Sequence, residues 1–142
     1  MKLQDQAAKM GATPNWMGHV QVESVDARAA LAKKLGGKVH KEPTDIPAVG
    51  RFAVIADPQG ASMSIFKPSQ AASQAIELRD ASKEGEFCWN ELMTSDSAAA
   101  FKFYSEMFGW RIYGEVDVGT MRTYRVYGVG EVGGAGLRGD IA

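Results

Sequence analysis

A strand, a tight turn and a second strand are predicted between Gly50 and Pro68, and this hairpin constrains the fold more than any other segment. Apolar and β-branched residues occupy both arms, and the reversal falls at Asp57-Pro58-Gln59-Gly60. Proline pre-sets φ at the second position of a turn, and glycine accepts the positive φ that other residues resist. We therefore expect a β-hairpin here, and most of the pattern around it occurs twice in the chain.

The first occurrence covers residues 14–68. Apolar and polar residues alternate from Trp16 to Val22, as in a half-buried strand. Good helix formers then follow Asp26, a residue type that caps helices, and Gly36-Gly37 ends the run. The expected elements are a strand over 16–22, a helix from Asp26 through Leu35, a short strand over 38–40, a proline-bounded loop over 43–47 and the hairpin.

The second occurrence covers residues 85–142. Asp96 is placed to cap a helix that Gly109 ends, and Phe101, Tyr104 and Phe108 have the spacing of a buried helix face. Strands are expected over 86–93, 110–113, 123–127 and 132–137.

Both segments therefore have the order β-α-β-β-β, which indicates a duplicated unit and an α+β fold. Residues 1–13 form an N-terminal extension in this division. Residues 69–84 are polar and alanine-rich without proline or glycine, and we interpret them as a linker or as a surface helix near 73–81.

Composition excludes several classes of function. The formal net charge of −1 gives no electrostatic reason to expect a nucleic acid or an anionic membrane as partner. No apolar run approaches the roughly 20 residues that span a bilayer, and residues 1–6 lack the apolar core of a secretory signal. The single cysteine, Cys88, excludes an intramolecular disulfide and a site of several thiolates. We expect a soluble cytoplasmic protein.

Nearly the whole chain beyond the first dozen residues resembles the glyoxalase / bleomycin-resistance / extradiol-dioxygenase proteins, the vicinal-oxygen-chelate superfamily. The most specific features are the FY…FGW element at 103–110 and the DPxGA turn at 57–61. The resemblance implies two βαβββ units whose sheets curl around a cleft for a ligand, often with a metal.

The order of the units differs from that of the family. The first unit resembles the one that usually comes second in a family module, and the second resembles the one that usually comes first. The cleft is therefore expected either within one chain in permuted order or between two chains that exchange units. Exchange of an identical element is a low-cost route to a dimer, and we favour a homodimer, with units swapped as an alternative.

The resemblance also indicates where a metal would bind. His19 falls on the first-strand ligand position, but Trp89 occupies the equivalent position in the second unit, and Ser64 stands where a glutamate is expected. Metal sites need several converging imidazole or carboxylate ligands. We therefore expect no bound metal and no cofactor. A weak divalent-metal site using His19, Gln21 and Glu91 is the alternative.

We expect five residues to converge on one ligand cavity: His19, Gln21, Ser64, Trp89 and Glu91. His19 is either a hydrogen-bonded histidine of the cleft or a metal ligand, and Trp89 is either a ligand wall or core. Glu91 is the candidate catalytic residue, as a general base, or binds a cationic ligand. The alternative for Glu91 is a salt bridge to an arginine, namely Arg51, Arg122 or Arg125.

The expected function is the binding of a small, partly aromatic or apolar organic molecule, as in drug-sequestering proteins of this family, without metal. A metal-dependent lyase, isomerase or dioxygenase is a second hypothesis. The third is a pair of units from a larger tandem protein, without activity alone.

Overall fold

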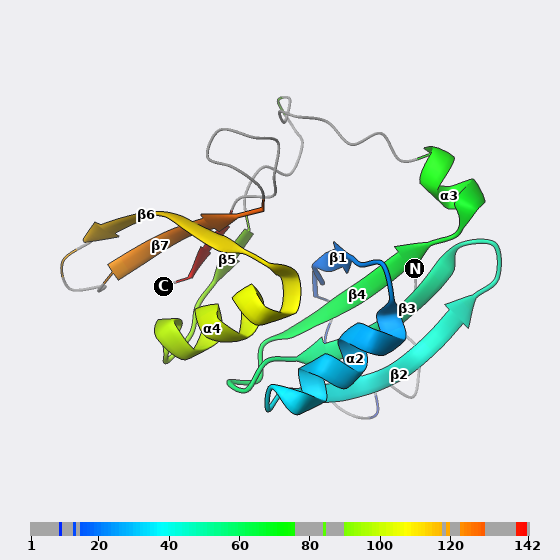
Figure 1. Cartoon of the computed structure of the whole chain (residues 1–142), viewed down its shortest axis with the longest axis horizontal. Helices are drawn as coiled ribbons and strands as arrows, with labels where there is room; N and C mark the ends of the chain where they lie inside the picture. Colours follow the sequence, from blue (N-terminus) through cyan, green and yellow to red (C-terminus); the bar gives the residue numbers. More distant parts are fainter. Residues whose placement is uncertain are drawn as a thin grey trace.

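Each half of the chain forms a four-stranded sheet with one helix packed against it (Figure 1). The structure, a computed structural model, describes residues 9, 13, 15–75, 84, 90–117, 119, 123–129 and 139–141. The expected α+β plan of two βαβββ units is confirmed.

The first unit contains five elements in the order expected from the sequence. Its strands lie in the order β1-β4-β3-β2, with β1 parallel to β4 and the other pairs antiparallel. The elements are β1 (His19–Gln21), α2 (Val25–Lys34), β2 (Lys38–Ile46), β3 (Gly50–Ala56) and β4 (Ser62–Pro68).

The second unit repeats this arrangement. Its strands lie in the order β5-β8-β7-β6, and β5 is parallel to β8. The elements are β5 (Asn90–Leu92), α4 (Ser97–Phe108), β6 (Arg111–Asp117), β7 (Thr123–Gly128) and β8 (Gly139–Ile141). The strand expected over 132–137 lies outside the described residues.

Between the units, the helix expected near 73–81 begins earlier. The structure contains α3 (Gln70–Ala75), and residues 76–83 lie outside the described part of the chain.

The cap of helix α2 was predicted wrongly. The structure places Ser24 at the N-cap, where its hydroxyl accepts a hydrogen bond from the Ala27 amide at 3.3 Å. Asp26 lies in the first turn instead, and both of its carboxylate oxygens accept 2.8 Å hydrogen bonds from Arg51 of β3. This hydrogen bonding lowers the pKa of Asp26. An aspartate early in a helix therefore serves as a link to the sheet here, while the preceding serine caps the helix.

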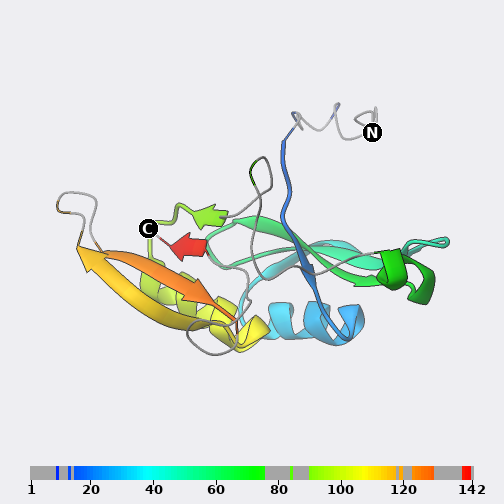
Figure 2. The same ribbon diagram turned by 90° about the horizontal axis from the view of Figure 1, so that it is seen from above.

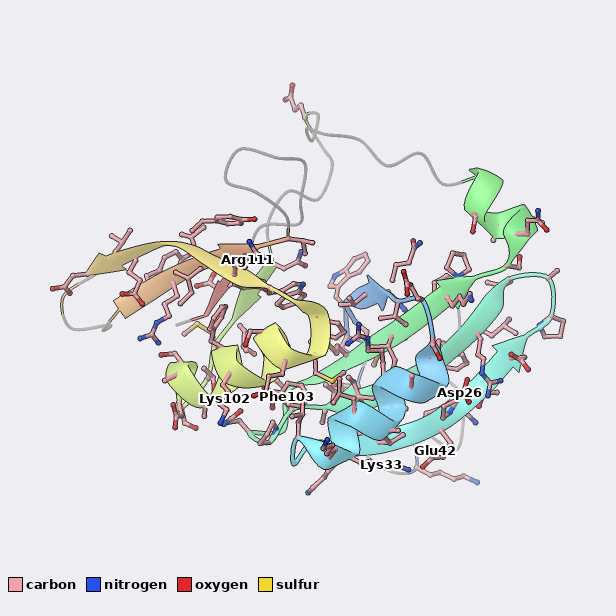
Figure 3. The ribbon with its side chains drawn as sticks, in the orientation of Figure 1. Asp26, Lys33, Glu42, Lys102, Phe103 and Arg111 are labelled. Atoms are coloured by element: carbon pink, nitrogen blue, oxygen red, sulfur yellow. The ribbon has the colours of Figure 1, made fainter. Side chains whose placement is uncertain are left out.

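The predicted loop over residues 43–47 is also largely wrong, because β2 continues through Pro43 to Ile46. The pairing of β2 with β3 shifts register between Lys41 and Thr44, and proline is tolerated in strands at such irregularities and at sheet edges. Strand β2 lies at the outer edge of its sheet. Lys33 of α2 and Glu42 of β2 form an ion pair at 2.8 Å across this region (Figure 3).

The predicted hairpin is confirmed. Strands β3 and β4 pair in register from Gly50↔Pro68 to Ala56↔Ser62, and the turn contains Gly60 at φ 100°. The Gly60 amide donates to the Asp57 carbonyl at 3.0 Å, and the Asp57 carboxylate accepts from the Ala61 amide at 2.8 Å. The aspartate therefore holds the turn through both its backbone and its side chain.

One hydrophobic core runs through both units. Helices α2 and α4 lie on the same side of the sheets (Figure 2) and contact each other. Phe101, Tyr104 and Phe108 pack in or against this core, as their helical spacing predicted. The units therefore pack together within one chain. No helix in the described part of the chain is long and apolar enough to cross a membrane.

Candidate functional site

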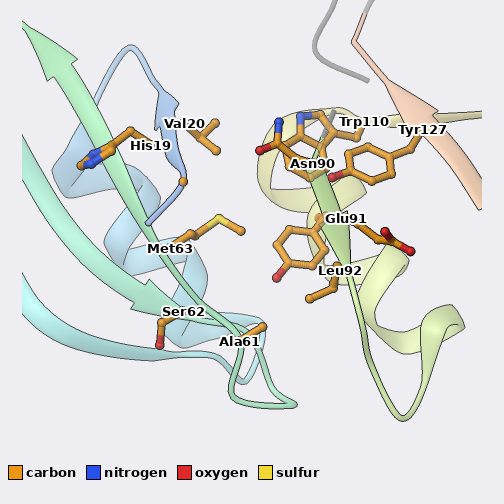
Figure 4. A pocket seen from close by; sticks show the side chains of 12 residues that line it. His19, Val20, Ala61, Ser62, Met63, Asn90, Glu91, Leu92, Trp110 and Tyr127 are labelled. Atoms are coloured by element: carbon orange, nitrogen blue, oxygen red, sulfur yellow. The ribbon is translucent and has the colours of Figure 1, made fainter. Parts of the chain in front are cut away.

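A pocket with a volume of about 240 Å³ lies between the two units, where β1 and β4 face β5 (Figure 4). The first unit contributes the end of the Asp57 turn and the edge of its sheet. The second unit contributes β5 and three aromatic side chains. The lining residues are Gly18, His19, Val20, Ala61, Ser62, Met63, Asn90, Glu91, Leu92, Tyr104, Trp110 and Tyr127.

Strand alternation decides which side chains enter this space. Val20 is paired with Ile65, a fully buried core residue, so its side chain lies on the helix face of the first sheet. Leu92 packs against the core, and Asn90, two residues earlier, has the same orientation. Figure 4 shows Val20 and Met63 facing Asn90 and Leu92 across the gap. The first unit therefore presents an aliphatic wall to the second.

The opposite wall is aromatic. The Trp110 ring lies between Tyr104 and Tyr127, with ring centroids 5.4 and 4.6 Å away and interplanar angles of 19° and 21°. All three residues are at most 8% exposed. Stacked rings give a large apolar surface with few rotatable bonds. Because both faces of the Trp110 ring are covered, the indole borders the pocket by its edge, within an apolar wall that suits an apolar molecule.

Tyr104 also joins the units. Its hydroxyl donates a hydrogen bond of 2.9 Å to the carboxylate of Asp57, which is 2% exposed. Burial, followed by the nearby Asp57 charge, raises the pKa of Tyr104 well above its ordinary value, so the phenol stays protonated as the donor. The bond fixes one wall of the pocket to the turn that closes its other side.

His19 and Glu91 both border the pocket, but their side chains turn away from it. Figure 4 shows the imidazole and the carboxylate on the far sides of their strands from the gap. The register agrees, because His19 pairs with Ser64 on the sheet face opposite Val20. Both residues are exposed. The predicted roles of His19 in binding and of Glu91 as a general base stay predictions for that opposite face.

Of the other predicted site residues, Gln21 and Ser64 do not line the pocket. Gln21 borders a separate surface depression with Lys67 and Ser73. Ser64 is fully buried, and its hydroxyl oxygen has no hydrogen-bond partner among the described residues. Trp89 lies outside the described residues.

Two of the three arginine partners suggested for Glu91 form ion pairs with other residues. Arg51 pairs with Asp26 and Asp45, and Arg125 pairs with Glu115. Arg122 lies outside the described residues.

The donor groups do not fit a divalent metal in the part of the chain that the structure describes. No three histidine, cysteine, aspartate or glutamate side chains come together there. Ser64, at the position where the family resemblance expects a glutamate, offers one buried hydroxyl. The weak site suggested for His19 and Gln21 of β1 with Glu91 of β5 stays a prediction.

The sequence did not predict that Tyr104, Trp110 and Tyr127 form one wall of a pocket. Tyr104 was assigned to the core by its helical spacing, which is correct, but the same ring also lines the pocket. Trp110 follows the helix directly and Tyr127 lies on β7, so no sequence pattern places the three rings together. The available signal was the density of aromatic residues from 101 to 110 beside a helix-ending glycine.

No family model matches the sequence. A 61-residue segment is 52% identical to CFP32 of Mycobacterium tuberculosis, whose name describes it as a glyoxylase; the match covers 42% of this chain and 23% of CFP32. A 94-residue segment is 30% identical to the anthracycline biosynthesis protein DnrV of Streptomyces peucetius, covering 66% of this chain and 33% of DnrV.

The fold matches that of a glyoxalase family protein from Enterococcus faecalis. The TM-score is 0.53 at 13% identity, and the match covers 89% of this chain and 92% of the other. This similarity shows the fold. The chain matches only about a quarter to a third of the length of its curated relatives.

Proposed function

We propose that this chain, which belongs to the glyoxalase / bleomycin-resistance / extradiol-dioxygenase (vicinal-oxygen-chelate) superfamily, binds a small apolar or aromatic organic molecule between its two units without a metal. The aromatic-walled pocket carries this proposal. An apolar cavity of about 150 Å³ holds benzene, so about 240 Å³ accommodates a molecule of one or two rings.

Sequestration is favoured over catalysis by the orientation of the ionisable groups. Among the described lining residues, the histidine and the carboxylate turn away from the space that a ligand would fill. General acid–base chemistry needs a group within hydrogen-bond reach of the reacting proton. Tyr104 is committed to Asp57 as a donor. The pocket thus offers contact area rather than a proton relay.

A titration with indane, a neutral bicyclic hydrocarbon, tests the proposal. Saturable shifts of Val20, Met63 and Leu92 methyl resonances are expected in NMR spectra. Val20→Phe should fill the pocket and abolish these shifts. Val54→Phe is the matched control, because Val54 is also half-buried but pairs with Ser64 on the opposite face of the sheet. Absence of saturable binding to the parent protein would contradict the proposal.

Native mass spectrometry tests the metal-free part. The protein is sprayed with and without added Zn²⁺, Ni²⁺, Mn²⁺ or Fe²⁺, and the denatured mass gives the bare chain. No stoichiometric metal is expected. A retained metal would contradict this part and favour the lyase, isomerase or dioxygenase hypothesis. The same spectra test the homodimer, which remains a prediction from the sequence, as does a cytoplasmic location.

A second proposal is that this pair of units works within a larger tandem arrangement. The partial coverage of CFP32 and DnrV supports it. In that case the pocket should remain empty with indane, while the protein still folds cooperatively. Binding of indane by this chain alone would count against the second proposal.

A further inference from the structure

The pocket contains an unused hydrogen-bond donor. Trp110 is 8% exposed and makes ring contacts, but its indole nitrogen has no hydrogen bond to the described residues. Among those residues, Ser64 Oγ is the side-chain atom that is both fully enclosed and unbonded. The unbonded indole nitrogen therefore still reaches open space, and the pocket is the space that this ring lines. Buried tryptophan usually finds an acceptor for this group.

A second polar group enters from β5. Asn90 has the orientation of Leu92 by strand alternation, and Figure 4 shows its amide directed to the gap. The amide forms no hydrogen bond with other described residues, and Asn90 is exposed at the side of the pocket. An asparagine amide can donate and accept. The two groups together give the apolar pocket a polar end.

Among the described residues, no charged side chain accompanies these two groups. The described part of the lining contains no lysine, arginine or aspartate, and the His19 and Glu91 side chains point away. Burying an unpaired ion in an apolar site is strongly unfavourable. The walls therefore exclude carboxylates and ammonium ions more than neutral molecules.

We infer that the pocket selects a neutral, planar aromatic molecule of one or two rings that carries a carbonyl oxygen, with the Trp110 indole N–H and the Asn90 amide as hydrogen-bond donors to that oxygen. The inference rests on the proposed function and adds the ligand class and the residues that determine specificity. The rings of Tyr104 and Tyr127 hold Trp110 in place, and Met63 and Val20 close the other face of the ligand.

The test compares two probes that differ in one group, 1-indanone and indane. Both are titrated into ¹⁵N-labelled protein while the three tryptophan indole N–H resonances are followed. The Trp110 resonance is assigned by elimination from the Trp16→Phe and Trp89→Phe spectra. We expect 1-indanone to bind about five-fold more tightly than indane, the gain of one net hydrogen bond, and to move the Trp110 resonance downfield.

Asn90→Leu supplies the matched variant, because the residue is exposed and its replacement is not expected to disturb the core. It should weaken 1-indanone binding about three- to ten-fold and leave indane binding unchanged or stronger. Asn15→Leu, at an exposed asparagine outside the pocket, should change neither.

Equal affinities for the two probes, together with an unaffected Asn90→Leu variant, would overturn the ligand class and leave the binding function standing. If neither probe binds, both the inference and the proposed function fail.

Discussion

The two units share one plan but fill their interiors differently. In the first unit, helix α2 faces its sheet with small residues, since Ala29 and Ala32 are its buried centre together with Val25. In the second unit, helix α4 buries Phe103, Tyr104 and Met107. Small side chains let a helix approach a sheet closely, whereas large rings hold it further away and create concave surface between them.

The closely packed first unit and the ring-rich second unit contribute differently to the pocket. Close packing in the first unit includes the backbone, because a Cβ atom at Gly37 would lie 2.5 Å from the Ala56 carbonyl oxygen. The rings that wall the pocket all come from the second unit, and the first unit contributes the aliphatic surface opposite them. Two units of the same topology can thus differ in the side chains that they bring to the pocket.

The largest expected loss of stability follows from closing a backbone contact in the first unit. In Gly50→Ala, the new Cβ would lie 2.3 Å from the Lys67 carbonyl oxygen, at a φ of 153° that alanine resists. We expect a loss of about 4 kcal/mol in the free energy of unfolding, measured by urea denaturation. Gly60→Ala, at φ 100° with open space around it, should lose only about 1–2 kcal/mol. Equal losses would show that steric closeness does not set the cost of the Gly50→Ala substitution.

The next largest loss of stability is expected from removing the hydrogen bond between Tyr104 and Asp57, which joins the two units. Tyr104→Phe removes the donor to the buried Asp57 carboxylate and should cost about 2–3 kcal/mol, because that oxygen loses a partner without regaining water. Urea denaturation, followed by tryptophan fluorescence and by far-UV circular dichroism, measures this loss. Parental stability in the variant would contradict the role of this bond.

The same pair predicts a pH dependence. Because the folded pKa of Tyr104 is raised, deprotonation above about pH 10 occurs more readily in the unfolded chain. The stability contributed by Tyr104 is therefore complete below pH 10 and is lost as pH rises further towards the folded pKa. The stability difference between parent and Tyr104→Phe should shrink above pH 10 in urea melts. A constant difference up to pH 11 would contradict the raised pKa.

The change in side-chain volume should decide the cost of a substitution at a fully buried position of either helix. Ala32 is fully buried in the closely packed unit, so Ala32→Leu is expected to cost about 2–3 kcal/mol. Met107 is equally buried among rings, and Met107→Leu conserves volume and should cost less than about 1.5 kcal/mol. Thermal denaturation measures both. A larger loss of stability for Met107→Leu than for Ala32→Leu would contradict this expectation.

The smallest effect tests the corrected helix start. Ser24→Ala should cost about 1 kcal/mol, because the Ala27 amide loses its capping acceptor. Asp96→Ala should cost a similar amount at the start of α4, where Asp96 accepts from the Ala99 amide at 2.9 Å. Chemical denaturation resolves these losses, and an unaffected Ser24→Ala would restore Asp26 as the cap.

The sequence predicted the presence and order of the helices and strands better than the residues at which they begin and end. The turn at Asp57–Gly60 and the cap at Asp96 are local features, and both are confirmed. The extension of β2 through Pro43 depends on pairing with β3, so local turn residues alone gave the wrong boundary. For helix α2, two residues of capping type lie two positions apart, at Ser24 and Asp26, and the ion pair with Arg51 accounts for the role of Asp26.

The site was harder to predict because it depends on which face of each strand meets the other unit. His19 and Glu91 were chosen for their chemistry and do border the pocket, but alternation turns their side chains away. Val20, Asn90 and Leu92 are the neighbours that face inward. A shift of one residue along a strand exchanges the two faces.

A crystal structure of the protein with 1-indanone bound tests the central claim most directly. The account predicts the ligand between Met63 and Trp110, with both units of one chain around it and its oxygen near Asn90. Ligand bound on the opposite face beside His19 or Glu91, or held between units of two different chains, would contradict it.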